Sequence, residues 1–273
     1  MIQFPNCKIN LGLSILEKRA DGYHELETVF YPIALNDVVE ILPAHHNAAL
    51  VTFTHTGIPV PGSTEHNLCI KAYYLLRKDF PTLPPIQMHL HKNIPMGAGL
   101  GGGSSDGTAV LKMLNEQFGL LLNKEELVNY AAQLGSDCPF FVFENACHGT
   151  GRGEILSPFD CDLSNYQIIL LHPGIHISTA WAFGQLKPHA KQKSIATIVA
   201  QPIDTWKAAL INDFEAPVFE AHPLLSELKN YCYEQGAIYV SMSGSGSSLF
   251  GIFPKDTPFE KPKFHDALRI DII

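Results

Sequence analysis

Several patterns that would identify common protein classes are missing from this sequence. No Gly-Lys pair occurs in its 273 residues, which excludes a Walker phosphate loop. No apolar run approaches 18 residues and no signal-peptide core precedes the first strand-like pattern, so we expect a soluble, cytoplasmic protein without membrane contact. No block of five like charges occurs and the net charge is −8, so nucleic acid is not an expected partner.

Cysteine and histidine patterns typical of metal sites or disulfide frameworks are also missing. The six cysteines form no Cys-x-x-Cys pair, which predicts reduced thiols. The thirteen histidines include His89 and His91 on one expected strand face, but no third ligand stands at metal-site spacing. We therefore expect neither a structural disulfide nor a zinc site.

The composition is that of an ordinary globular protein. Hydrophobic residues make up 46% and charged residues 17% of the chain, and 273 residues can bury one large core or two medium ones. A boundary is expected near residues 158–165, which divides the chain into domains 1–160 and 161–273. No internal repeat or low-complexity tract is visible.

Period-two and helical patterns alternate along the chain. Strands are expected over 8–15, 26–33, 38–42, 49–55, 86–92, 167–171, 237–242 and 249–253, with a last short strand at the end. Helices are expected over 67–78, 123–134, 179–186, 224–234 and 259–268. The second of these helices begins with a capping box formed by Asn123 and Glu126.

The most informative stretch is the glycine-rich segment from Pro95 to Asp106. It joins the expected strand 86–92 to a helical pattern, with Ser104, Ser105 or Asp106 as candidate N-caps. Glycines allow backbone N–H groups to approach a ligand closely, and a helix N-terminus adds free donors and partial positive charge. The segment therefore predicts an anion-binding loop. The bare dinucleotide-binding pattern also fits, but no acidic residue stands at the end of a second strand about 20 positions later, and a flexible linker would lack the patterned flanks.

Three other positions carry possible chemistry. Lys8 and Asn10 share one face of the first strand, and the small residues that follow them suggest close packing there. Tyr23 and His24 follow an Asp-Gly turn and could pack in the fold or present a ring and a polar edge to a planar ligand. Asp137 lies in a turn between Gly135 and Pro139, where either a turn-stabilising or a catalytic carboxylate would fit.

Three separated motifs give the chain a resemblance to the GHMP kinase superfamily. They are Pro5-Asn-Cys-Lys-Ile-Asn10-Leu, the glycine-rich segment, and Met242-Ser-Gly-Ser-Gly-Ser247. The resemblance implies an α+β fold with an N-terminal ribosomal-S5-like domain and a C-terminal ferredoxin-like domain. Arg19-Ala-Asp-Gly-Tyr-His24 and Gly135-Ser-Asp-Cys-Pro-Phe-Phe141 are similar to the members that phosphorylate a cytidine-diphosphate-linked alcohol. Cys7 and Gly107 stand where the family often has alanine.

The resemblance also implies ligands and residue roles. ATP and Mg²⁺ are the implied cofactors, and the implied substrate carries a cytidine diphosphate group; the protein would be a monomer or a weak homodimer. The phosphates of ATP would be held by Pro95, Met96, Gly97, Ala98, Gly99, Leu100, Gly101, Gly102, Gly103, Ser104 and Ser105, with Ser105 near Mg²⁺. Asn67 and Lys92 fall where the family binds adenosine.

The remaining implied roles concern catalysis and the acceptor. Asp137 resembles the catalytic aspartate, which would also contact the substrate, and Lys8 resembles its cationic partner. Tyr23 and Phe183 match positions that sandwich a cytosine ring, and His24 and Asn10 match positions that hydrogen-bond the nucleotide. Gly244, Ser245 and Gly246 belong to the third motif, which supports the phosphate loop and the acceptor.

Two alternatives stay open at this stage. Another small-molecule kinase of the superfamily, for homoserine or mevalonate, would lack the Asp-Gly-Tyr-His element. A catalytically silent nucleotide-binding protein would not need both Lys8 and Asp137.

Overall fold

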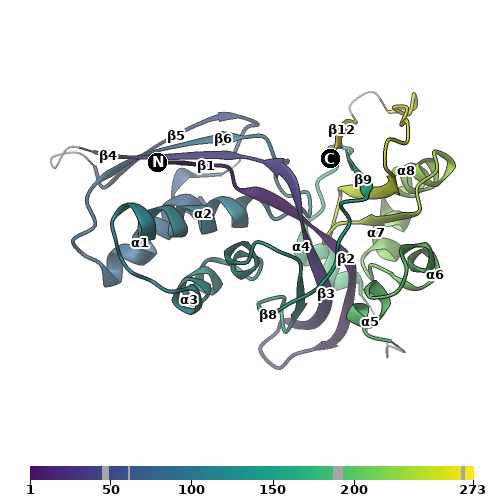
Figure 1. The fold of residues 1–273 in the computed structure, drawn as a ribbon, viewed down its shortest axis with the longest axis horizontal. Helices are drawn as coiled ribbons and strands as arrows, with labels where there is room; N and C mark the ends of the chain where they lie inside the picture. The colour runs from purple at the N-terminus through teal and green to yellow at the C-terminus, as the bar shows by residue number, and fades with distance from the viewer. Residues whose placement is uncertain (45–48, 61, 187–192, 266–267) are drawn as a thin grey trace. The chain divides into compact units, whose positions relative to one another are not determined.

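The computed structural model describes residues 1–44, 49–60, 62–186, 193–265 and 268–273, and the chain separates into two compact units (Figure 1). The first unit contains residues 1–7, 34–96 and 101–144, and the second contains residues 8–33, 97–100 and 145–273. The glycine-rich segment therefore contributes residues to both units. Within the described part of the chain, no helix is long and apolar enough to cross a membrane.

The first unit is a four-stranded sheet with helices on one side (Figure 1). The strand order is β1 (Ile2–Gln3), β4 (Val38–Pro43), β6 (Ile86–Lys92) and β5 (Val51–Gly57), and only the β5–β6 pair is parallel. The covering helices are α1 (Leu68–Asp79), α2 (Gly102–Gln117) and α3 (Lys124–Leu134). Short 3₁₀ helices span Thr64–His66 (η1) and Cys138–Val142 (η2).

The core of the first unit lies between this sheet and its helices. Alternate residues Ile86, Met88 and Leu90 of β6 are buried there, as the period-two pattern predicts. Helix α1 packs so closely on α2 that a Cβ added at Gly107 would lie 2.9 Å from the Cβ of Leu68. The glycine in α2, which is unfavourable for helix propensity alone, is thus explained by the close approach of two helices.

The second unit contains two four-stranded sheets. One has the order β2 (Asn6–Lys18), β3 (His24–Asn36), β7 (Cys147–Thr150) and β8 (Ile155–Pro158). The other has the order β10 (Tyr239–Met242), β11 (Leu249–Pro254), β9 (Tyr166–His172) and β12 (Arg269–Ile272), with antiparallel pairs throughout. Its helices are α4 (Thr179–Gln185), α5 (Ile195–Val199), η3 (Ile203–Thr205), α6 (Trp206–Ala209), α7 (Glu215–Ala221) and α8 (Pro223–Glu234).

Most expected elements are present, and two expectations were wrong. Helix α2 begins at Gly102 with Gly101 as its N-cap, so none of Ser104, Ser105 and Asp106 caps it. Residues 259–265 form no helix, because Pro258 and Pro262 interrupt the helical pattern.

Candidate active site

The glycine-rich segment leads directly into the first turn of helix α2. Gly101 adopts the left-handed conformation (φ 69°) and precedes the helix, and the first intrahelical hydrogen bond runs from Ser105 N to the Gly101 carbonyl (2.9 Å). The N–H groups of Gly102, Gly103 and Ser104 come before that bond, where helical N–H groups have no intrahelical partner. This turn therefore has the donors and the dipole that an anion requires. Ser105 itself is buried.

The three sequence motifs meet at one backbone carbonyl in the second unit. The Gly99 oxygen accepts hydrogen bonds from Lys8 Nζ (3.1 Å) and Ser243 Oγ (2.8 Å). Lys8 N also donates to the Leu100 carbonyl, and Ser248 N donates to the Ala98 carbonyl. Strand β2, the glycine-rich segment and the turn 243–248 thus fix one another.

Position 99 requires glycine because the backbone of Ser243 lies directly against it. Its φ is +79°, and an added Cβ would lie 1.9 Å from the Ser243 carbonyl oxygen. Gly244 lies against Gly99 in turn, since a Cβ there would be 3.2 Å from the Gly99 Cα.

Lys8 and Asn10 form a buried polar pair on β2. Asn10 Oδ1 accepts from Lys8 Nζ (2.7 Å), and Asn10 Nδ2 donates to Thr28 Oγ1 (3.0 Å). The face that carries them is packed closely, as the small residues in β2 indicated: a Cβ at Gly12 would lie 2.5 Å from a Leu210 methyl carbon. These contacts orient Lys8, whereas a contact of Asn10 with a nucleotide stays a prediction.

Lys92 lies in a buried ion-pair cluster in the first unit. Its ammonium group contacts the Asp37 carboxylate and pairs with Asp106 Oδ2 at 2.8 Å, and no part of its side chain is exposed. Asp37 Oδ1 also accepts from the backbone N–H groups of Asn93 and Ile94, at the entry to the glycine-rich segment. The cluster therefore fixes that entry, and a contact between Lys92 and a nucleotide stays a prediction.

Two carboxylates, Asp37 and Asp106, share one lysine in this cluster. The pKa values of Asp106 and Lys92 reflect the excess negative charge. Burial and the neighbouring Asp37 raise the pKa of Asp106 to about 7, although Lys92 opposes the change. Burial alone would lower the pKa of Lys92, but Asp106 and Asp37 together raise it above its ordinary value. At neutral pH the Asp106 carboxyl therefore lies near the midpoint of its titration.

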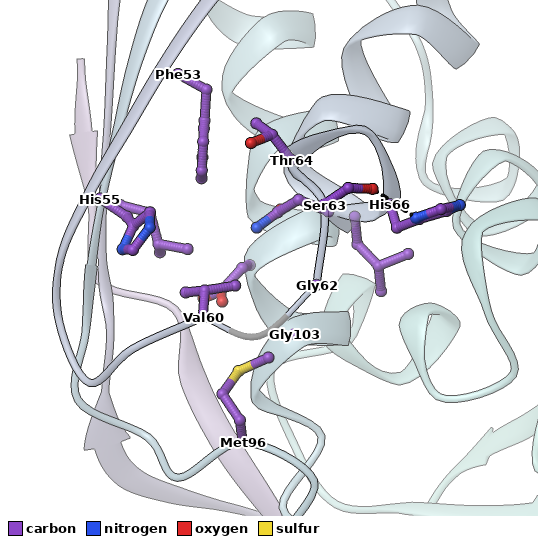
Figure 2. Close-up of a pocket in the computed structure, with 13 residues that line it drawn as sticks. Phe53, His55, Val60, Gly62, Ser63, Thr64, His66, Met96 and Gly103 are labelled. Atoms are coloured by element: carbon purple, nitrogen blue, oxygen red, sulfur yellow. Dashed lines mark hydrogen bonds between the residues drawn. The ribbon is translucent and has the colours of Figure 1, made fainter.

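A pocket of about 200 Å³ adjoins the start of α2 within the first unit (Figure 2). Apolar side chains form much of its wall, and its polar side chains come from residues 63–67, from His55 of β5 and from Asp106 of α2. The pocket is lined by Phe53, His55, Val60, Gly62, Ser63, Thr64, His66, Asn67, Leu68, Leu90, Met96, Gly103 and Asp106. Asn67 is the N-cap of α1, and its Oδ1 accepts from Cys69 N. An apolar pocket with a few polar groups beside an anion-binding helix terminus suits the base and sugar of a nucleotide.

Asp137 belongs to the first unit and lies directly before η2. Its side chain makes no capping hydrogen bond to that short helix. Thr108 Oγ1 of α2 donates to the Cys138 carbonyl (3.0 Å), which ties the turn that carries Asp137 to α2. Lys8 belongs to the second unit, and the pairing of Lys8 with Asp137 stays a prediction.

The aromatic residues expected to bind a base lie at the start of β3 and in α4. Tyr23 is exposed (54%), with the Arg152 guanidinium carbon 4.6 Å from its ring centroid. The rings of His24 and Phe183 are stacked, with centroids 4.8 Å apart and planes inclined by 20°. Burial, followed by the charge of Lys18, lowers the pKa of His24, so its imidazole is mainly neutral at pH 7. A sandwich between Tyr23 and Phe183 stays a prediction.

Comparison with known proteins shows the family to which this chain belongs. The family model for the GHMP kinases N terminal domain matches residues 67–145, and that for the GHMP kinases C terminal region matches residues 198–263. The chain is 48% identical over 267 residues to 4-diphosphocytidyl-2-C-methyl-D-erythritol kinase of Bacteroides fragilis, which covers 98% of this chain and 97% of that protein. The chain belongs to this family of GHMP kinases.

Further relatives support the assignment. The enzyme of the same name from Bacteroides thetaiotaomicron is 51% identical over 253 residues, 93% of this chain and 92% of that protein. A crystal structure of 4-(cytidine 5'-diphospho)-2C-methyl-D-erythritol kinase superposes with a TM-score of 0.80 at 30% identity and covers 92% of this chain and 90% of that one. The expected α+β fold of the GHMP kinases is thereby confirmed.

Sequence reasoning missed several residues that shape the candidate site. Asp37 and Ser243 make the contacts described above, and Arg152 stacks on Tyr23. One signal was available: the alternation that predicts β6 places Lys92 on the same buried face as Leu90, where a lysine requires a carboxylate partner. The identity of that partner, 55 residues away in the chain, has no local signal.

Proposed function

We propose that this protein transfers the γ-phosphoryl group of ATP to the 2-hydroxyl of 4-diphosphocytidyl-2-C-methyl-D-erythritol, a step of the non-mevalonate isoprenoid pathway. It is a small-molecule kinase by family, and ATP is the phosphate donor that the family implies. The observation that carries the proposal is the meeting of Lys8, Gly99 and Ser243 at one carbonyl. That contact joins all three motifs, and the names of the relatives supply the acceptor.

The residues suit a reaction dominated by positioning and electrostatics. Phosphoryl transfer passes through a loose transition state, so a kinase gains most from aligned groups and from offset charge. The first turn of α2 would bind the ATP phosphates through backbone N–H groups. The pocket lined by Asn67 would bind the nucleoside. Lys8 would offset charge on the phosphoryl group as it moves.

Asp137 is proposed to act on the acceptor hydroxyl. Its carboxylate would orient the hydroxyl toward the phosphorus atom and accept the proton late in the transfer. Tyr23, His24 and Phe183 would bind the cytidine end of the acceptor by stacking and hydrogen bonding. These roles rest on the match of each residue to the family motifs.

Mg²⁺ is proposed as the metal ion that accompanies ATP. Among the residues that the structure describes, no group of three or more His, Cys, Asp or Glu side chains could hold a metal ion by itself. Proteins commonly hold Mg²⁺ through substrate phosphates and one or two side chains, so its binding here would depend on ATP. Ser105 is the side chain predicted nearest to it, and the ion would offset phosphate charge when bound.

The direct test is detection of the product. The purified protein should convert 4-diphosphocytidyl-2-C-methyl-D-erythritol and Mg-ATP into ADP and the 2-phosphorylated product, identified by phosphorus NMR. Mevalonate and homoserine should react far more slowly under the same conditions. Absence of a 2-phosphorylated product from folded protein, or preference for a free alcohol, would overturn the proposal.

A further inference from the structure

Asn212 lies in a short segment that pairs with the strand carrying Lys8. Leu13 N donates to the Ile211 carbonyl (3.0 Å), and Asp213 N donates to the Leu13 carbonyl (2.9 Å), so Asn212 stands opposite Leu13 in a parallel bridge. Asp213 Oδ2 also accepts from Ile15 N at 2.7 Å. These bonds fix the backbone of Asn212 relative to β2.

The side chain of Asn212 is buried (1% exposed) and makes three hydrogen bonds to backbone groups. Its Nδ2 donates to the carbonyls of Met242 (2.7 Å) and Gly244 (2.8 Å), and its Oδ1 accepts from Phe214 N (3.0 Å). Only a primary amide of this length offers two donors and one acceptor in this arrangement. The amide therefore holds both sides of Ser243.

Ser243 is the residue through which this restraint reaches the glycine-rich segment. Its hydroxyl donates to the Gly99 carbonyl, which also accepts from Lys8 Nζ. The Ser243 carbonyl fills the space that a side chain at position 99 would need. A shift of residues 242–244 would therefore displace Gly99 and change the surroundings of the Lys8 ammonium group.

We infer that Asn212 is a positioning residue for phosphoryl transfer: its amide sets the turn 242–244, and through it the Gly99 carbonyl and Lys8. It acts through Ser243 and need not touch ATP or the acceptor. The inference rests on the proposed function, because it assigns Gly99 and Lys8 to the ATP phosphates. It adds a residue outside the three motifs to the machinery of that reaction.

The test compares Asn212→Asp with Asn115→Asp. Asn115 is a matched control, since its side chain also bridges backbone groups, donating to the Leu122 carbonyl (3.0 Å) and accepting from Leu122 N (2.9 Å), at the far end of α2. An aspartate at position 212 loses both donors and faces two carbonyl oxygens. Losing such buried hydrogen bonds should lower kcat/KM for ATP about 10- to 100-fold.

Three readouts separate positioning from a general loss of structure. Asn212→Asp should raise KM for ATP and lower kcat, with a smaller effect on the dissociation constant of the cytidine-linked acceptor. Asn115→Asp should lose a similar amount of thermal stability and keep wild-type kinetics. Wild-type kinetics for folded Asn212→Asp, or an activity loss equal to the loss of folded protein, would overturn the inference.

Two further measurements keep the inference testable if Asn212→Asp does not fold or if the proposed function is wrong. If Asn212→Asp does not fold, Ser243→Ala breaks the next contact in the same path, and unchanged ATP kinetics there would also overturn the inference. If the wild-type protein does not phosphorylate the cytidine-linked alcohol, the proposed function fails by itself. Binding of a non-hydrolysable ATP analogue to wild type, Asn212→Asp and Asn115→Asp then decides the inference, which requires weaker binding only for Asn212→Asp.

Discussion

Replacing Asp106 with asparagine should stabilise the protein at pH 8, and by clearly less at pH 5. Asp106 shares the buried Lys92 with Asp37, so two carboxylates face one ammonium group and the ionised cluster carries one negative charge in excess. The pKa of Asp106 is raised from 3.8 to about 7. The folded protein therefore binds more protons than the unfolded chain between about pH 4 and 7, and its stability falls as the pH rises through that range.

The magnitude follows from this difference in pKa. A carboxyl shifted from 3.8 to about 7 opposes folding by roughly 4 kcal/mol once both states are ionised. Asparagine has the shape of the protonated acid and leaves Lys92 paired with Asp37, so it should recover part of that energy, about 1–4 kcal/mol at pH 8. At pH 5 the native carboxyl is still protonated and only the unfolded chain has lost its proton, so the effect of the substitution should be about 2–3 kcal/mol less stabilising there than at pH 8.

Urea unfolding monitored by circular dichroism measures the free energy of unfolding of wild type and variant at pH 5 and at pH 8. The control is Asp162→Asn: Asp162 is exposed, and the backbone N–H of Ser164 lowers its pKa, so its substitution should have the same effect at both pH values. An equal effect of Asp106→Asn at pH 5 and pH 8, or a destabilisation that grows toward pH 8, would refute the reasoning.

Three further predictions concern catalysis, substrate binding and thermal stability. Asp137→Asn should lower kcat by roughly 10²- to 10⁴-fold with an unchanged circular dichroism spectrum, and near-full activity would contradict its assignment. Tyr23→Ala should weaken binding of the cytidine substrate about 5- to 150-fold in calorimetry; an equal loss of ATP affinity would place Tyr23 elsewhere. Gly99→Ala should lower the melting temperature more than Gly174→Ala, because both glycines have φ near +75° but only position 99 has atoms within 4 Å of an added Cβ. Equal losses would contradict the close contact.

Local chemistry made some elements predictable from the sequence. The capping box of Asn123 and Glu126 needs only residues three apart, and both of its hydrogen bonds are present in the structure. The period of two that predicts β6 and the helical spacing that predicts α8 are equally local, and these elements begin and end within one residue of the expected bounds.

Where long-range contacts decide the structure, the sequence was a poorer guide. Helix α2 begins at Gly102 because Gly101 takes a left-handed conformation, although serine and aspartate three to five residues later are better N-caps by type. The contact of Gly99 with Ser243 spans 144 residues, and that of Asn212 with Gly244 spans 32. The motifs predicted that these glycines matter, but not which side chains hold them in place.

The distribution of positive charge shows how an acidic protein can bind polyphosphate. The chain has a formal charge of −8, and Lys92, adjacent to the glycine-rich segment in sequence, is neutralised by Asp37 and Asp106. Lys8 Nζ donates to Asn10 Oδ1 and to the Gly99 carbonyl, where the three motifs meet. The charge of Lys92 is thus used within the fold, whereas the backbone N–H groups and the dipole at the first turn of α2 suit phosphate whatever the net charge of the chain.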